Sequence, residues 1–173
     1  MSQLPEVEVI RKDLEREIVG KRFKDITVKN ASMVARHRNR PEFVKALQGR
    51  KIDGIMRRGT WLLMHLDDGA ALAIRLGPQG TLTRETATEE AGRHTQLVAT
   101  FTTGGSLHYV DPAKSGEVFV AEPGQINSLS ELTPPGIDPL ADTFTWQVFS
   151  DQLRERDTSL KQALCDETFL IGL

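Results

Sequence analysis

The first periodic segment of the chain predicts an amphipathic helix over residues 5–19. Apolar side chains recur there at steps of three and four residues, namely Val7, Ile10, Leu14 and Ile18, and this spacing places them on one face of a helix. Pro5 suits the first turn, where a missing amide hydrogen costs nothing. Gly20 favours a stop just after the last apolar position.

Short stretches of β-type composition dominate the next hundred residues. We expect strands over 23–28, 51–57, 60–66, 70–76, 96–102, 106–110 and 117–121, with one short helix over 41–48. Asp67-Asp68-Gly69 and Thr103-Gly104-Gly105 each separate two such stretches and are typical of hairpin turns. The polar, acidic stretch over 84–93 is predicted to be a mobile loop. Strands this short and closely spaced indicate a β-sandwich or a barrel.

A change of composition divides the chain into two predicted units, 1–130 and 131–173. Leu132-Thr133-Pro134-Pro135-Gly136 interrupts the strand pattern, as linkers do. Two helices are expected beyond this break, because Asp142 and Ser159 each precede apolar residues at helical spacing and can cap a helix.

Several side chains of the second unit are predicted to be buried. We expect Trp146 to anchor a helical core, as Trp61 anchors the sandwich, and Cys165 to fill core space as a small apolar residue. The final stretch, Phe169–Leu173, is apolar. We therefore expect it to contact a part of the protein beyond residue 173 or a second copy of the chain.

Composition and charge fit a globular protein of the cytoplasm. The 173 residues are 39% hydrophobic and 27% charged, and a chain of this length can bury a core. No stretch approaches the roughly 18 consecutive apolar residues of a membrane helix, so no membrane partner is expected. The chain shows no secretory signal pattern, and its one cysteine excludes an internal disulfide and a thiolate-rich metal site. The net charge of −2 does not by itself indicate nucleic-acid binding, although acidic residues elsewhere can offset a basic face.

Several motifs occur in order along almost the whole chain. They are Leu4-Pro5-Glu6-Val7-Glu8, Val19-Gly20-Lys21, Arg57-Arg58-Gly59 before Trp61-Leu62-Leu63, Leu76-Gly77 with Gly80, Asp111-Pro112 with Gly116, Leu132–Gly136 with Pro139-Leu140, and Lys161 with Ile171-Gly172. In this order they resemble the N-terminal part of the formamidopyrimidine-DNA glycosylase and Nei family of base-excision repair enzymes. The resemblance implies an α+β fold: an N-terminal helix, a two-layer antiparallel β-sandwich, and the start of a helix–two-turn–helix (H2TH) module. It also implies that the zinc finger of the family lies beyond residue 173, so no cofactor or metal is expected in this chain.

The resemblance assigns the catalytic positions, and the chain departs from the family at several of them. In the family, the second residue is a proline whose amine attacks the sugar, and the third is a glutamate that moves protons; here they are Ser2 and Gln3. A glutamine cannot act as an acid or base, a contribution of roughly 10²–10⁴-fold. A lysine of the family corresponds to Thr60, whose hydroxyl carries no charge. Glu6 either stabilises the helix dipole or orients the terminus or a flipped nucleotide, and both interpretations stay open.

The resemblance also places contacts to DNA. The family residues that fill the space left by a flipped base correspond to Pro78, Ala113 and Ser115, and alanine and serine lack the bulk that this role requires. The expected contacts to double-stranded DNA, abasic or otherwise damaged, are Arg57, Arg58, Arg75, His94, Lys114 and Lys161. The basic run from Arg36 to Arg40 is a further candidate, because phosphate contacts dominate nucleic-acid affinity.

Three functions are compatible with these observations. The first is recognition of damaged DNA at the nucleoid with glycosylase activity lost or weak, as in a pseudoenzyme. The second is an active DNA glycosylase or AP lyase that uses the amine of Ser2, since a terminal amine with a pKa of about 8 is partly unprotonated and can form an imine. The third is an interaction scaffold that no longer binds DNA. Salt-dependent binding to an abasic-site duplex separates the first two from the third, and strand cleavage separates the first from the second.

Overall fold

The N-terminal helix forms where the apolar spacing predicts it. The computed structural model of the protein describes residues 4–86, 91–133, 135–141 and 143–172. Helix α1 spans Leu4–Ile18 and buries Leu4, Val7, Leu14 and Ile18. Gly20 follows with a φ of 85°, a left-handed conformation that favours glycine at a helix end. Its amide donates to the Ile52 carbonyl over 2.7 Å, so the chain turns directly into the sheet region.

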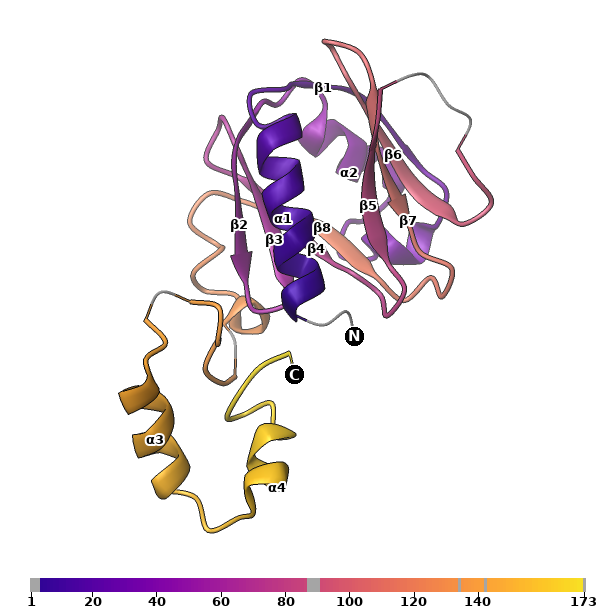
Figure 1. The fold of residues 1–173 in the computed structure, drawn as a ribbon. Helices are drawn as coiled ribbons and strands as arrows, with labels where there is room; N and C mark the ends of the chain where they lie inside the picture. The colour runs from indigo at the N-terminus through magenta and orange to yellow at the C-terminus, as the bar shows by residue number, and fades with distance from the viewer. Residues whose placement is uncertain (1–3, 87–90, 134, 142, 173) are drawn as a thin grey trace.

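In the described residues, eight strands form two four-stranded antiparallel sheets that face each other (Figure 1). One sheet has the order β1-β6-β7-β5 and the other has the order β2-β3-β4-β8. The strands are β1 (Phe23–Val28), β2 (Ile52–Arg58), β3 (Trp61–Leu66), β4 (Ala71–Arg75), β5 (Thr81–Glu85), β6 (Thr95–Phe101), β7 (Ser106–Val110) and β8 (Glu117–Ala121). Apart from β5, these bounds agree with the predicted strands to within one residue. The two separate sheets decide the choice between sandwich and barrel in favour of the sandwich.

Strand β5 corrects the loop predicted over 84–93. Arg84 lies in this strand, which pairs antiparallel with β7 in the register Leu82↔Tyr109 and Arg84↔Leu107. Leu82 is the buried residue of β5, so the sequence shows too little apolar alternation to indicate a strand. The pairing with β7, rather than intrinsic preference, makes this segment a strand. Residues 87–90 of the predicted loop lie outside the described residues.

The main core lies between the two sheets, and helix α2 (Arg40–Leu47) contributes Phe43 and Leu47 to it. A second apolar cluster covers the other face of β3, β4 and β8. It comprises Trp61, Leu63, Ala71, Ala73, Phe119, Ala121, Ile126 and Leu132, of which Leu132 belongs to the short 3₁₀ helix η2 (Ser130–Leu132). Because both faces of β3 are covered, its sequence is continuously apolar rather than alternating. The burial of Trp61 was expected and is confirmed.

Two short helices form a separate lobe below the sandwich in the view of Figure 1. Helix α3 spans Trp146–Arg154 and α4 spans Leu160–Leu164. Helix α4 begins after Ser159, which forms a capping box with Gln162 and confirms the predicted cap. Helix α3 begins after Thr145, whose hydroxyl accepts the Val148 amide and so satisfies a group that the helix cannot pair itself. The predicted cap, Asp142, lies outside the described residues.

The apolar tail packs within its own lobe. Phe169 is fully buried and stacks on Phe149 with ring centroids 5.5 Å apart. Ile137 and Leu170 form an isolated parallel bridge that ties the tail to the linker. The described apolar residues of the tail are therefore buried against this chain. The predicted contact with a further part of the protein or with a second copy stays a prediction.

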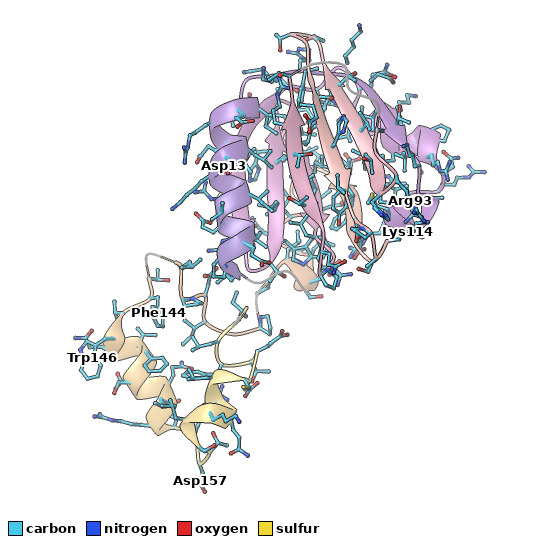
Figure 2. The ribbon with its side chains drawn as sticks, turned by 45° about the vertical axis from the view of Figure 1, so that its right-hand side comes forward. Asp13, Arg93, Lys114, Phe144, Trp146 and Asp157 are labelled. Atoms are coloured by element: carbon cyan, nitrogen blue, oxygen red, sulfur yellow. The ribbon has the colours of Figure 1, made fainter. Side chains whose placement is uncertain are left out.

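Two side chains expected in the core of this lobe are exposed instead. Trp146 is 68% exposed and projects outward from α3 in Figure 2, and Cys165 is also exposed. The interior of the lobe is filled by Ala163, Phe169 and Leu170, with Phe144, Phe149 and Leu153 packed against them. Trp146 and Cys165 therefore lie on the faces of α3 and α4 that the lobe does not cover, and both predictions of burial were wrong. Among the described residues, no helix combines the length and apolar character of a membrane span.

His37 supports the edge of the second sheet. Its Nε2 accepts a hydrogen bond from the Val120 amide of edge strand β8 over 3.1 Å, and its ring packs edge-on against Phe43 with centroids 5.2 Å apart. Burial lowers the pKa of His37 below its usual value, while Glu42 and Glu122 act in the opposite direction. The neutral imidazole is therefore the form that the fold requires.

We expect the stability of the protein to fall between pH 7.5 and pH 5.5, in part through His37. The unfolded chain binds a proton at His37 near pH 6.5, whereas the folded chain binds it only at a lower pH. The free energy of unfolding therefore decreases as the pH drops through this window. His37→Gln keeps an acceptor and removes the titration, so its stability should change less. Urea unfolding of both proteins at the two pH values measures this, and equal losses would contradict it.

Candidate nucleic-acid interface

A cleft of about 380 Å³ opens where the sandwich meets the C-terminal lobe. Thr60 lines it together with Arg58 and Arg75, so three predicted site residues lie in one place. The other lining residues are Arg36, Gly59, Trp61, Glu117, Glu131, Pro135, Glu167, Ile171 and Gly172. The lining comes from segments that are far apart in sequence: the stretch before α2, the ends of β2 and β4, the starts of β3 and β8, η2, and the region that follows it.

The first turn of α1 reaches the rim of this cleft. The Leu4 amide donates to the Gly172 carbonyl over 3.2 Å. A side chain added at Gly172 would come within 2.5 Å of the Leu4 side chain, so the two segments are in close contact. Ser2 and Gln3, the predicted catalytic positions, lie outside the described residues.

The cationic side chains in the cleft are matched by carboxylates. Glu117 accepts from both Arg36 and Arg75, over 2.5 and 3.0 Å, and Glu131 pairs with Arg36. The hydrogen bond from Arg36 lowers the pKa of Glu131 below its usual value. Three arginines and three glutamates line the cleft in all. Its formal charge is therefore near zero, although it is rich in arginine.

Arg36 lines the cleft, although the sequence indicated it only as one member of a basic run. It follows the 3₁₀ helix η1 (Ala31–Val34), and its guanidinium lies 4.0 Å from the centroid of the Phe119 ring, a favourable cation–π position. The basic run over 36–40 was the only feature of the sequence that indicated a contact of Arg36 with DNA. Charge patterning does not reveal that Arg36 points into the cleft while Arg40, four residues later, does not line it.

Arg57 is buried between the sandwich and the C-terminal lobe. Its side chain is 6% exposed and contacts Glu8 of α1 at 2.9 Å and Asp138 of the linker at 2.5 Å. Glu8 also binds Arg11 at 2.8 Å, and the Arg11 hydrogen bond contributes most to the lowered pKa of Glu8. This cluster joins α1, β2 and the linker. The predicted contact of Arg57 with DNA is untested and stays a prediction, whereas its structural contacts are evident.

Tyr109 connects the loop after β4 to the loop after β7. Its hydroxyl accepts the Gly77 amide over 3.2 Å and donates to the Arg75 carbonyl over 3.3 Å. Burial raises the pKa of Tyr109 to about 12, so the donor stays protonated. A side chain at Gly116 would come within 1.7 Å of the same hydroxyl. Glycine is therefore needed at position 116, so that the loop after β7 can lie against the Tyr109 hydroxyl and the loop after β4.

Asp111 organises the loop after β7. Its side chain is fully buried and accepts the backbone amides of Ala113, Ser115 and Gly116 over 2.8–3.0 Å. The Asp111 amide in turn donates to the His94 carbonyl over 2.9 Å. The Asp111 carboxylate therefore fixes the backbone conformation of this loop. Ala113 and Ser115 are exposed on the loop.

The other predicted site residues lie outside the cleft. Glu6 and Pro78 are exposed and line a separate hollow of about 430 Å³ between α1 and the loop after β4. His94 and Lys114 are exposed at the end of the sandwich, and Lys161 is exposed on α4 of the C-terminal lobe. None of these roles is tested by the structure. No group of three or more histidine, cysteine, aspartate or glutamate side chains in the described part of the chain is arranged to bind a metal ion.

Comparisons with known proteins agree with this architecture. Residues 1–118 match the family model of the formamidopyrimidine-DNA glycosylase N-terminal domain. Relatives include the formamidopyrimidine-DNA glycosylases of Ligilactobacillus salivarius, 34% identical, and Bacillus subtilis, 32% identical, each over 173 residues. All of this chain aligns with 62% of each of these proteins. The chain thus spans less than two thirds of the length of its relatives.

Solved structures give the same result. The structure of Lactococcus lactis Fpg in complex with DNA containing an abasic site has a TM-score of 0.85 and 29% identity, over 99% of this chain and 62% of that one. A structure of MutM in complex with DNA containing carbocyclic 8-oxo-G has a TM-score of 0.84, also at 29% identity, over 99% of this chain and 64% of that one. The match of the family model over more than half of the sequence shows that this chain belongs to the formamidopyrimidine-DNA glycosylase family.

Proposed function

We propose that this chain binds duplex DNA at damaged or abasic sites and that its glycosylase activity is lost or weak. The observation that carries the proposal is the position of Thr60. It lies in the cleft where the lobes meet, beside the rim formed by the start of α1, at the position where the family has a lysine. The two solved relatives described above were bound to abasic or lesion-containing DNA. Such a role would place the protein at the nucleoid in the cytoplasm.

The expected weakness in catalysis follows from the chemistry of three positions. Gln3 cannot transfer protons as the glutamate of the family does, and Thr60 brings no positive charge to the sugar or phosphate. Ser2 offers a primary amine only if the initiator methionine is removed. The space left by a flipped base would be filled poorly by Ala113 and Ser115, which are small. We keep 1–130 as the glycosylase-like unit and 131–173 as the start of the DNA-binding helical unit in this proposal.

Binding and cleavage assays test the proposal. We expect the chain to bind a 24-base-pair duplex carrying a tetrahydrofuran abasic-site analogue more tightly than the undamaged duplex, measured by fluorescence anisotropy. Cleavage of a duplex with a true abasic site should be at least about 10²-fold slower than with the Bacillus subtilis relative, in line with the loss of one acid–base group. Equal affinity for both duplexes would contradict the proposed recognition of damaged DNA. Cleavage as fast as that of the relative would contradict the proposed loss of catalytic activity.

A surviving lyase activity is the alternative, and one observation favours it. The start of α1 contacts the cleft rim, because the Leu4 amide donates to the Gly172 carbonyl. Borohydride trapping on abasic-site DNA tests this lyase activity, and an adduct at Ser2 would establish it.

In the Ser2→Pro, Gln3→Glu, Thr60→Lys variant we expect trapping and cleavage to increase. If trapping and cleavage do not increase, the small side chains of Ala113 and Ser115, in place of the bulky residues of the family, would account for the inactivity. Absence of duplex binding even at low salt would favour the non-DNA scaffold.

A further inference from the structure

Five basic side chains gather at one corner of the sandwich, outside the cleft. Lys29 follows β1, Arg40 begins α2, Arg93 and His94 precede β6, and Lys114 lies in the loop after β7. All five are exposed. We call this set the basic corner.

Hydrogen bonds bring the segments of the basic corner together. The Arg40 guanidinium donates to the Lys29 carbonyl over 3.0 Å, and the Lys29 ammonium donates over 3.2 Å to a carbonyl of the segment that leads into β6. The His94 carbonyl accepts the Asp111 amide, which places the loop after β7 against the start of β6. Figure 2 shows Arg93 and Lys114 at the same end of the sandwich. Four segments that are distant in sequence therefore present their charges on one surface.

The charges of the basic corner differ from those of the cleft in their partners. In the cleft, Arg36 and Arg75 are paired with carboxylates. The ion pairs between described residues include none from the basic corner. The nearby Asp111 carboxylate is buried and engaged by three backbone amides. Clustered surface cations that have no carboxylate partner among the described residues attract a polyanion.

We infer that the basic corner binds the phosphate backbone of duplex DNA and extends the interface beyond the cleft. This inference rests on the proposed function. The loop that carries Lys114 ends at Glu117, which lines the cleft, so the corner and the cleft are joined along one edge of the molecule. Because the cleft is close to neutral, it supplies little long-range attraction, and the basic corner supplies the charge that salt-sensitive DNA binding requires.

Removal of these charges tests the inference. The corner variant carries Lys29→Gln, Arg40→Gln, Arg93→Gln and Lys114→Asn, the last because asparagine tolerates the positive φ of Lys114, 54°. The control variant carries Lys12→Gln, Arg16→Gln, Lys24→Gln and Lys45→Gln. It loses the same charge from exposed positions on α1, at the start of β1 and at the end of α2. Affinity for the abasic-analogue duplex is measured from 50 to 300 mM salt, with thermal unfolding of each variant as a check on folding.

Each phosphate contact contributes about 0.9 to the slope of log affinity against log salt. We expect the corner variant to lose about 2–4 from this slope and the control variant to match the wild type. Equal slopes for all three proteins, with normal wild-type binding, would overturn the inference and leave the proposed function intact. No wild-type binding would overturn both. Wild-type binding to anionic phospholipid vesicles that is lost in the corner variant, with equal slopes on DNA, would assign the corner to a lipid surface and overturn the inference.

Discussion

Replacing Arg57 with methionine is expected to lower the free energy of unfolding by about 3–5 kcal/mol, the range for breaking a buried ion pair from one side. The substitution leaves Glu8 and Asp138 without their shared cation. These carboxylate side chains are 19% and 14% exposed, so water replaces the cation poorly. Because the three residues join α1, β2 and the linker, the loss should appear in the C-terminal lobe as well as in the sandwich. Chemical denaturation monitored by circular dichroism measures the change.

Two controls separate the ion cluster from a general loss of charge. Lys51→Met breaks the exposed pair with Asp53 and should cost no more than about 1 kcal/mol. Combining Arg57→Met with Glu8→Gln and Asp138→Asn removes all three charges, and part of the lost stability should return. A loss of less than about 1 kcal/mol for Arg57→Met alone would show that the cluster contributes little. Arg57 would then be free for the predicted contact with DNA.

Replacing Asp111 with alanine is expected to cost about 2–4 kcal/mol and to weaken DNA binding. Three backbone amides lose a charged acceptor, and each hydrogen bond to a charged group contributes about 1.5–3 kcal/mol in buried positions. Because the tip of the loop is exposed, water can replace part of these interactions, so the expected loss of stability is smaller than the sum for three bonds. Urea denaturation and anisotropy binding measure the two effects.

The asparagine variant sharpens this test. Asp111→Asn keeps one acceptor oxygen in nearly the same shape, so we expect an intermediate loss of stability. Asp25→Ala removes a carboxylate from the exposed part of β1 and should change stability by less than about 0.5 kcal/mol, as surface substitutions usually do. If Asp111→Ala unfolds at the same urea concentration as the wild type, the loop does not depend on this carboxylate.

The sandwich could be predicted because its strands are short, apolar and separated by clear turns. Strands β1, β7 and β8 have the predicted bounds, since alternation and turn residues act locally. Strand β5 could not be predicted, because its pairing with Tyr109 and its neighbours on β7 is a long-range interaction. The exposure of Trp146 was missed for a related reason. Helical spacing shows which residues share a face, but not which of two faces a small lobe will cover.

The sequence named some residues of the candidate site but not its electrostatics. Arg58, Thr60 and Arg75 line one cleft. Arg57 and Lys114, which the resemblance also placed toward a cleft, do not line it, and the roles of all these residues stay predictions. The sequence did not indicate that Glu117 would pair with Arg75 there. The two residues are far apart in sequence and meet only when the chain folds, so no local pattern reveals the pair. The burial of Arg57 was equally hidden, since its partners come from residues 8 and 138.

The contact between Leu4 and Gly172 has a practical consequence for the design of tagged proteins. Both residues lie at the rim of the cleft, so a purification tag fused before the helix or after the lobe would emerge beside the surface being assayed. A cleavable tag that leaves no extra residues avoids steric interference with long duplexes. The Asp67–Gly69 turn joins the end of β3 to the start of β4, at the opposite end of β3 from Thr60, and is the better site for a fluorophore or an epitope.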